Sequence, residues 1–318
     1  MKIYIKTPAR LHLGLIDLNG ELGRIFGGLG VAIDHPNVIL EAEKAQTLVV
    51  SGEKAELTRK LASCFLEACE LKEKVAINVK EVIPEHIGLG SGTQLALAIA
   101  SSISRLFDLK ASCYELAAIM ERTSQSGVGT AVFAQGGLVV DAGKNTKDLS
   151  QKIIPLICRQ PFPFEWQFVV AIPNVKKGLS NEAEASAFKQ LPPMPANDAG
   201  KICRLTMIKL LPAVFEKDIK SFGEAMTQIQ CIVGDSFAQA QGGRYSSSLS
   251  AKCIEFMLEN GVHGAGQSSW GPAVYGVVKS DKAQETRAKV NAFLLKSVGG
   301  KVFVAKPNNR GAIIKVFE

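Results

Sequence analysis

The chain has 318 residues, of which 47% are hydrophobic and 21% are charged, and its formal net charge is +7 at pH 7. These proportions are ordinary for a soluble globular enzyme and exclude a disordered chain. The lysines and arginines are scattered without a dense basic block, which argues against nucleic acid as a partner, and no apolar segment is long enough to span a membrane.

The first half of the chain mixes predicted strands and helices. Apolar and polar residues alternate between positions 75 and 79, which is typical of a half-buried strand. The N-terminal residues predict a strand that ends at a proline and an arginine, not a signal peptide. Further strands are predicted over residues 2–6, 38–42, 47–50 and 138–140, and helices over 54–71, 95–107 and 114–121.

The second half opens after a proline-punctuated stretch, residues 155–163, where we expect a domain boundary. The expected domains are therefore 1–160 and 161–318. Strands are predicted over residues 166–172, 273–278 and 301–305, and helices over 201–215, 219–237, 249–260 and 283–297. Strands and helices in both halves indicate an α+β fold.

The glycine loop, residues 84–94, lies between a predicted strand and an apolar helix. Three glycines within five residues allow backbone N–H groups to converge on one point, where the helix dipole adds positive potential. We therefore expect a phosphate or pyrophosphate to bind here, although a tight connection alone is the competing interpretation. The loop fits neither the Walker pattern nor the dinucleotide fingerprint. Its candidate binding residues are Gly88, Gly90, Ser91, Gly92, Thr93 and Gln94.

Two cationic or ionisable side chains near the N-terminus, Arg10 and His12, are two residues apart and share one face of a strand. A glycine-rich turn over residues 23–30 carries Arg24 together with Gly27 and Gly28. The guanidinium groups suit phosphate oxygens, but surface salt bridging is the commoner role of an arginine. A lone histidine is likewise more often structural than catalytic.

Two further loops contain small and polar residues. Arg122 precedes a turn over residues 126–130 in which Ser126 offers a hydroxyl to an anion, unless the turn simply connects two helices. The late loop, residues 264–272, leads directly into a strand and carries a tryptophan. Trp270 forms either one wall of a slot for a planar ring or part of the core. The late loop's other candidate residues are Gln267, Ser268 and Ser269.

The seven cysteines include no Cys-x-x-Cys pair, and their number is odd. This pattern indicates neither a disulfide framework nor a thiolate zinc site. Reduced, mostly buried thiols are typical of a cytoplasmic protein. We therefore expect a cytoplasmic location.

Together the glycine loop, the N-terminal strand with its arginine turn, and the late Gly264-Ala265-Gly266 segment resemble the three motifs of the GHMP kinase superfamily. This resemblance covers essentially the whole chain. It implies an N-terminal domain similar to the second domain of ribosomal protein S5, a ferredoxin-like C-terminal domain, and a ligand between the two.

The chain departs from the kinases at two places. Kinases of this superfamily typically carry a catalytic aspartate where this chain has Gly129, and a run of glycines where it has Gln267 to Trp270. Without the carboxylate, no obvious group activates a hydroxyl for attack on ATP. With these departures the sequence resembles the β-ribofuranosylaminobenzene 5′-phosphate synthase branch. An ATP-dependent small-molecule kinase and a non-catalytic sensor are the alternatives.

The synthase resemblance implies condensation of phosphoribosyl pyrophosphate with 4-aminobenzoate or a related benzoate, with release of pyrophosphate and carbon dioxide, in methanopterin biosynthesis. It implies Mg²⁺ as cofactor, for which Asp17 and Glu121 are the candidate ligands. Arg10, Arg24 or Arg244 would hold the 5′-phosphate or the benzoate carboxylate. Arg10, His12, Asp17 and Trp270 are the candidate catalytic residues, and a homodimer is one expected assembly.

Overall fold

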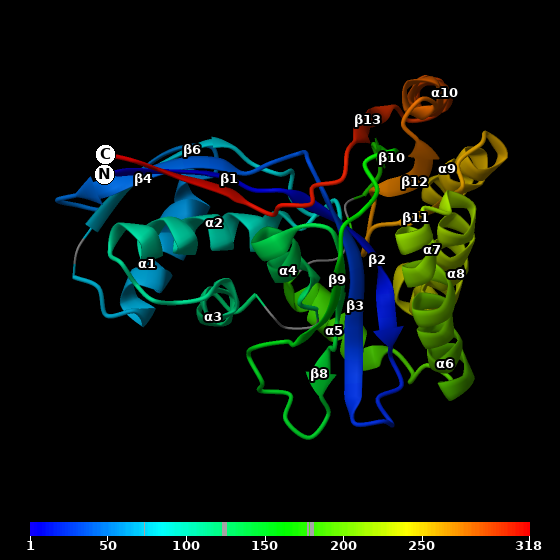
Figure 1. The fold of residues 1–318 in the computed structure, drawn as a ribbon, viewed down its shortest axis with the longest axis horizontal. Helices are drawn as coiled ribbons and strands as arrows, with labels where there is room; N and C mark the ends of the chain where they lie inside the picture. Colours follow the sequence, from blue (N-terminus) through cyan, green and yellow to red (C-terminus); the bar gives the residue numbers. More distant parts are fainter. Residues whose placement is uncertain (73, 123–125, 177, 179–180) are drawn as a thin grey trace.

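The computed structural model describes the whole chain except residues 73, 123–125, 177 and 179–180 and the side chains of residues 181–183 and 185. Figure 1 shows two bodies joined by long strands at the centre. One body holds both termini, and the other carries the helices of the second half. None of the described helices is both long enough and apolar enough to span a membrane.

The first sheet has the strand order β14-β1-β4-β6-β5 and forms one layer of the first body. The alternation in β1 places Ile3 and Ile5 in the core, where both are fully buried. Helix α2 packs on this sheet, and most of its residues are buried because α1, α3 and α4 also pack against it. The elements are β1 (Lys2–Lys6), β4 (Ile39–Ala45), β5 (Val49–Gly52), β6 (Lys74–Glu81), β14 (Ile313–Phe317), α1 (Ala55–Ala68) and α2 (Ser91–Leu106).

The second sheet, in the order β2-β3-β7-β9, occupies the centre of the molecule, and β8 pairs with β3. The sequence predicted a glycine-rich turn over residues 23–30, and this was wrong. Residues 24–30 belong to β3, because glycine lets helix α4 approach the strand, and only Gly23 lies in the turn before it. A Cβ on Gly30 would lie 2.5 Å from Val128 Cγ1. The elements are β2 (Ala9–Asp17), β3 (Arg24–Ile33), β7 (Leu138–Asp141), β8 (Lys144–Asn145), β9 (Leu156–Gln160), α3 (Cys113–Ile119) and α4 (Val128–Gln135).

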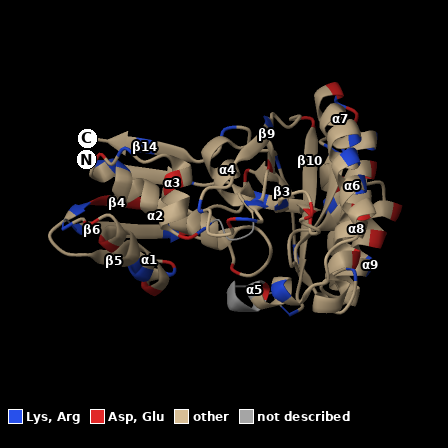
Figure 2. Cartoon of the chain, turned by 90° about the horizontal axis from the view of Figure 1, so that it is seen from below, with Lys and Arg blue, Asp and Glu red and all other residues tan. Residues whose placement is uncertain are grey.

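The third sheet, in the order β11-β12-β10-β13, belongs to the second half of the chain. It packs against α9 and α10, and their contact forms a separate apolar cluster. Acidic and basic residues are interspersed along the helices α6 to α9 (Figure 2). The elements are β10 (Trp166–Pro173), β11 (Gly264–Gln267), β12 (Val274–Lys279), β13 (Gly300–Ala305), α5 (Asn181–Gln190), α6 (Ala196–Arg204), the π-helix η1 (Leu205–Leu210), α7 (Leu211–Glu216), α8 (Ile219–Gln241), α9 (Ser248–Glu259) and α10 (Ala283–Leu295).

Three features of the second half differ from the sequence prediction. The predicted helix 201–215 begins earlier, at Ala196, and passes through η1 into α7. The late loop begins as strand β11. Neither α5 nor β14 was predicted, and β14 crosses back to pair antiparallel with β1. The first sheet therefore contains both ends of the chain, while a domain boundary near residue 160 stays a prediction.

Candidate active site

A cavity of about 670 Å³, here called the main cavity, opens where the first and second halves of the chain meet. Strand β2, the glycine loop, helices α5 and α8 and the late loop all contribute to its wall. Fourteen of the sequence-predicted residues line it: Arg10, His12, Gly88, Gly90, Ser91, Gly92, Thr93, Glu121, Arg122, Ser126, Arg244, Gln267, Ser269 and Trp270.

The glycine loop reaches the N-terminus of α2 through two left-handed glycines, Gly88 at φ 86° and Gly90 at φ 82°. A Cβ on Gly88 would lie 2.1 Å from the Ser268 carbonyl oxygen, so glycine allows the two loops to touch. No side chain caps the N-terminus of α2. Its first backbone N–H groups are therefore directed toward the cavity end of the helix, where an anion would complete their hydrogen bonding.

Arg10 connects the glycine loop to the rest of the cavity. Its Nη1 donates a hydrogen bond to the Gly88 carbonyl oxygen at 2.5 Å. Burial lowers the pKa of Arg10 to about 10, and the charge of Glu184 opposes that shift. Arg10 thus stays cationic at neutral pH, with donors remaining for an anionic ligand.

His12 begins a chain of polar contacts that ends at a carboxylate missed from the sequence. His12 Nε2 lies 3.4 Å from Ser126 Oγ, and Ser126 Oγ donates to Asp141 Oδ2 at 3.0 Å. Burial, with the nearby charge of Arg10, lowers the pKa of His12 to about 3. The imidazole is therefore neutral at neutral pH. The signal for Asp141 was a single carboxylate at the end of the apolar strand β7.

Asp141 also explains two predicted glycines. Its carboxylate accepts hydrogen bonds from the backbone N–H groups of Gly28 and Gly127, and burial raises its pKa. A Cβ on Gly28 would lie 2.5 Å from Asp141 Oδ2, and one on Gly27 would lie 3.2 Å from the Asp141 carbonyl oxygen. Gly27 and Gly28 do not line the main cavity; they allow β3 and β7 to enclose this carboxylate.

An aromatic cluster of Trp270, Phe188 and Phe237 forms another wall of the main cavity. The ring centroids of Trp270 and Phe237 are 4.7 Å apart, and those of Trp270 and Phe188 are 5.5 Å apart. Trp270 is buried, so the structure joins the two alternatives from the sequence: it packs among aromatic neighbours and also faces the cavity. A slot for a planar ring remains a prediction.

Glu184 on α5 was also missed. Trp270 Nε1 donates to Glu184 Oε1 at 3.0 Å, and Glu184 lines the main cavity. Burial raises the pKa of Glu184, while the indole hydrogen bond and the charge of Arg10 oppose the rise. The available signal was the alanine- and glutamate-rich composition of residues 181–190, which favours a helix.

Other predicted residues have structural partners. Asp17 Oδ1 accepts from the backbone of Asn19 and Gly20 and closes the turn after β2, away from the cavity wall. Arg24 donates to the carbonyls of Ala142 and Gly143, so its guanidinium is already engaged. The geometry does not favour a catalytic or metal role for Asp17, nor a phosphate role for Arg24.

Gln94, Ser268 and Arg244 join neighbouring segments. Gln94 is buried and donates to the Gly129 carbonyl at 2.9 Å. Ser268 Oγ donates to the Gly88 carbonyl at 2.6 Å and accepts from the His12 backbone at 2.9 Å. Arg244 lines the cavity but pairs with Asp235 at 2.7 Å. Their substrate-binding roles stay predictions.

Gly129, which the resemblance to the kinases aligns with their catalytic aspartate, faces Thr93 of α2. A Cβ there would lie 2.9 Å from Thr93 Cγ2. The threonine side chain therefore fills the space that a larger residue at position 129 would need. The carboxylates that line the main cavity among the described residues are those of Glu85, Glu121 and Glu184.

The described residues contain no group of three or more His, Cys, Asp or Glu side chains arranged to hold a metal ion. Glu121 lines the main cavity, whereas Asp17 does not. Mg²⁺ needs only one or two protein carboxylates when substrate phosphates and water supply the remaining ligands. Glu121 therefore fits such a site, and Asp17 does not.

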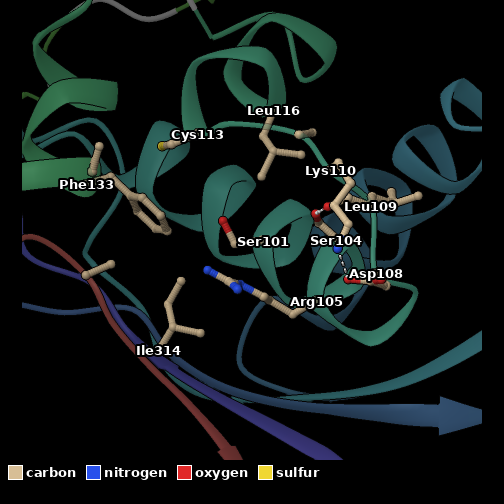
Figure 3. Close-up of a pocket in the computed structure, with 13 residues that line it drawn as sticks. Ser101, Ser104, Arg105, Asp108, Leu109, Lys110, Cys113, Leu116, Phe133 and Ile314 are labelled. Carbon is tan, nitrogen blue, oxygen red and sulfur yellow. Dashed lines mark hydrogen bonds and ion pairs between the residues drawn. The ribbon is translucent and has the colours of Figure 1, made fainter.

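A smaller cavity of about 420 Å³ lies at the opposite end of α2. Figure 3 shows Arg105 extending across it between Ser101 and Ile314. Several of its other polar groups have partners: Ser104 Oγ donates to the Leu109 carbonyl, and Lys110 pairs with Asp108 at 2.8 Å. The main cavity is therefore the better candidate for a charged substrate.

Two family models match the chain. The model for the GHMP kinases N-terminal domain matches residues 56–137, and that for the GHMP kinases C-terminal region matches residues 210–295. The matched segments contain the glycine loop with α2, α3 and α4, and the helices α8 to α10. The α+β fold predicted from the sequence is confirmed.

Curated relatives extend over nearly the full chain. A β-ribofuranosylphenol 5′-phosphate synthase of Methanothermobacter thermautotrophicus is 35% identical, covering 99% of this chain and 99% of the relative. One of the same name from Archaeoglobus fulgidus is 36% identical, with 98% and 99% covered.

Solved structures show the same fold. A homoserine kinase of Cytophaga hutchinsonii has a TM-score of 0.70 at 16% identity, covering 99% of this chain and 97% of that structure. The galactokinase of Lactococcus lactis complexed with galactose has a TM-score of 0.71 at 14% identity, covering 98% and 95%. At these identities the likeness is one of fold alone.

Proposed function

The chain belongs to the β-ribofuranosylphenol 5′-phosphate synthase family of the GHMP kinase superfamily, and from this premise we propose that it joins phosphoribosyl pyrophosphate to a 4-substituted benzoate. Pyrophosphate and carbon dioxide leave, and the product enters methanopterin biosynthesis. The relatives' name contains a phenol, so 4-hydroxybenzoate stands beside 4-aminobenzoate as the proposed acceptor. Because all seven cysteines are free, we place the enzyme in the cytoplasm.

The observation that carries this proposal is the contact of Gly129 with Thr93. Phosphoryl transfer to a hydroxyl needs a group that accepts or orients its proton, and position 129 offers none. The anion cradle and the buried Arg10 are nevertheless retained. A reaction in which a phosphate-bearing group departs uses the cradle without requiring the aspartate.

In the proposed reaction, the bond between ribose C1 and pyrophosphate breaks as the benzoate ring attacks C1. The N-terminus of α2 and the hydroxyls of Ser91 and Thr93 stabilise the departing pyrophosphate. Mg²⁺ held by Glu121 and the phosphates would neutralise further charge. The aromatic cluster holds the ring, and Arg10 holds its carboxylate beside the glycine loop. Carbon–carbon bond formation at the carboxylate-bearing carbon is followed by loss of carbon dioxide, which restores aromaticity.

The test follows the carboxyl carbon. Carboxyl-labelled 4-hydroxybenzoate or 4-aminobenzoate is incubated with phosphoribosyl pyrophosphate and Mg²⁺, and label, pyrophosphate and product are measured. We expect one labelled carbon dioxide and one pyrophosphate per product, with the 4-substituent free. A product that keeps the label contradicts the carbon–carbon bond. Formation of ADP from ATP with homoserine, mevalonate or a sugar, in the same preparation, would restore the kinase alternative.

A further inference from the structure

The Glu184 carboxylate faces the main cavity from α5, the one described carboxylate there that is hydrogen-bonded to the aromatic cluster. Its Oε1 accepts the Trp270 indole N–H at 3.0 Å. This contact fixes one oxygen of the carboxylate at the edge of the tryptophan ring. A planar ligand lying against Trp270 would therefore bring its own edge close to Glu184.

Arg10 is the oppositely charged partner of Glu184 in the same cavity. The two charges influence each other, yet they are not among the ion pairs within 4.0 Å that the described residues form. Arg10 is held at the glycine loop by its hydrogen bond to Gly88. The cavity thus presents a cation next to the phosphate cradle and an acceptor next to the aromatic cluster. A rigid ring with an anion at one end and a donor at the other matches both.

We propose that Glu184 binds the 4-substituent of the benzoate and takes its proton when that substituent is a hydroxyl. This inference rests on the proposed function and deepens it. Arg10 then holds the carboxylate end, which places the reacting ring carbon beside the pyrophosphate cradle. Glu184 holds the electron-donating end at Trp270. The residue thereby selects 4-hydroxy- and 4-aminobenzoates over benzoates that lack a donor.

The electron flow balances within this arrangement. The hydroxyl proton passes to Glu184, and the oxygen electron pair moves into the ring. The ring carbon bearing the carboxylate forms a bond to ribose C1 as the C1–oxygen bond breaks and its electron pair leaves with pyrophosphate. The bond to the carboxylate then breaks, carbon dioxide departs, and that electron pair restores the aromatic ring. The proton on Glu184 returns to the phenolate oxygen.

An amine substituent needs less help from Glu184. The neutral nitrogen lone pair can enter the ring while both protons stay on nitrogen, so no base is required before the new bond forms. Comparing the rates with the two acceptors therefore shows whether Glu184 acts as a base or only supports Trp270. A supporting residue would affect them equally.

The acid side of the pH profile gives a second signature. Burial raises the pKa of Glu184 above its ordinary 4.5, while the Trp270 hydrogen bond and Arg10 oppose that rise. Activity toward 4-hydroxybenzoate should therefore fall as pH drops through this raised pKa, since protonated Glu184 is no base. The other charged or titratable groups facing the cavity are His12, Glu85, His86, Glu121, Arg122, Arg244 and Tyr245.

The test compares Glu184→Gln with the wild type on both acceptors. Glutamine keeps an oxygen that accepts the Trp270 N–H, so indole fluorescence and melting temperature should stay close to wild type. We expect kcat/KM for 4-hydroxybenzoate to fall about 100-fold or more, the range of a lost general base, and that for 4-aminobenzoate to fall less than about 10-fold. The fall in activity with 4-hydroxybenzoate at low pH should disappear in Glu184→Gln. Glu255→Gln, on the exposed face of α9, is the matched control and should change neither value.

The assignment is overturned if Glu184→Gln lowers kcat/KM equally for both acceptors. It is also overturned if Glu184→Gln keeps the fall in 4-hydroxybenzoate activity at low pH. Should the glutamine variant fail to fold, Glu184→Asp decides: a withdrawn carboxylate should slow 4-hydroxybenzoate more than 4-aminobenzoate, and an unchanged ratio rejects the base. A wild-type enzyme that releases pyrophosphate with neither acceptor contradicts the proposed function itself. An active wild type with an unchanged acceptor ratio in the variant contradicts only the role of Glu184.

Discussion

Gly90 illustrates how a single residue sets the shape of the phosphate cradle. It caps the N-terminus of α2 at φ 82°, and a Cβ there would lie 2.9 Å from Arg10 Cγ. Gly90→Val should therefore strain the loop and displace Arg10, because a β-branched residue is especially disfavoured at positive φ. We expect affinity for phosphoribosyl pyrophosphate, measured by calorimetry, to fall about 100-fold or more, equivalent to about 2.7 kcal/mol.

The matched control is Cys158→Ser, which changes a free thiol on β9 outside the main cavity. It should bind phosphoribosyl pyrophosphate with wild-type affinity. A folded Gly90→Val protein that binds as tightly as the wild type would show that the cradle lies elsewhere.

His12 should leave a signature in the pH dependence of stability. Its pKa is about 3 in the folded chain against an ordinary 6.5, owing to burial and Arg10. Between these values the unfolded chain binds more protons, so the free energy of unfolding should fall as pH drops from 6.5 toward 3, by at most ~1.4 kcal/mol per pH unit from this group. Urea titrations of the wild type and His12→Gln across this range measure the difference.

The comparison with His12→Gln is needed because other groups act in the opposite direction. Asp141 and Glu184 have raised pKa values, so the folded chain binds extra protons there and gains stability as pH falls through those values. Their contributions remain in both proteins. Parallel stability curves for the two proteins below pH 6.5 would refute the assignment to His12.

At the scale of elements, packing of α4 on β3 depends on Gly30. A Cβ there would lie 2.5 Å from Val128 Cγ1 and 2.7 Å from the Leu11 carbonyl, with neighbours that belong to α4 and β2. Gly30→Ala should therefore push the helix from the sheet and lower the free energy of unfolding by about 1–3 kcal/mol, measured by urea denaturation.

Gly200, exposed within α6, provides the control with the same chemical change. A Cβ there meets no atom within 4 Å. Gly200→Ala should raise the free energy of unfolding by up to about 1 kcal/mol, because alanine is the better helix former. If both substitutions stabilise the protein, close packing at Gly30 is not what retains glycine in β3.

The same glycines show why parts of the fold escaped prediction. Strands and helices with regular apolar periodicity, such as β1, β6, α1 and α8, followed from the sequence. Local propensity predicts a turn at Gly27, Gly28 and Gly30. Their contacts with α4 and Asp141 explain why glycine is needed in a strand there instead. Strand β14 forms because it pairs with β1, which lies about 300 residues away in the sequence. Local sequence patterns do not reveal such a partner.

The candidate site was predictable to a similar degree. Its loops were visible because glycine, hydroxyl and guanidinium groups suit anions in any context. Glu184 and Asp141 were not visible, because each forms its site through a partner elsewhere in the chain. That partner is Trp270 for Glu184 and Ser126 for Asp141. Asp17 and Arg24 were selected by residue type, yet backbone atoms of neighbouring turns are their partners.

At the scale of the whole molecule, both halves of the chain are needed before the main cavity exists. Arg10 and the glycine loop come from the first half, and Glu184, Phe237 and Trp270 from the second. One apolar cluster also runs through both, from Ile3 and Leu13 to Ile229 and Tyr275. The halves are therefore packed as one unit around the site rather than tethered around an open gap.

The return of β14 to β1 has a consequence for synthesis of the protein. Residues 313–317 are made about 300 positions after residues 2–6, the strand with which they pair. Until residues 313–317 have left the ribosome, one edge of β1 stays unpaired and the first sheet cannot be completed. A nascent chain should therefore expose this strand edge while the intervening residues are translated, and such an edge is the kind of surface that chaperones protect.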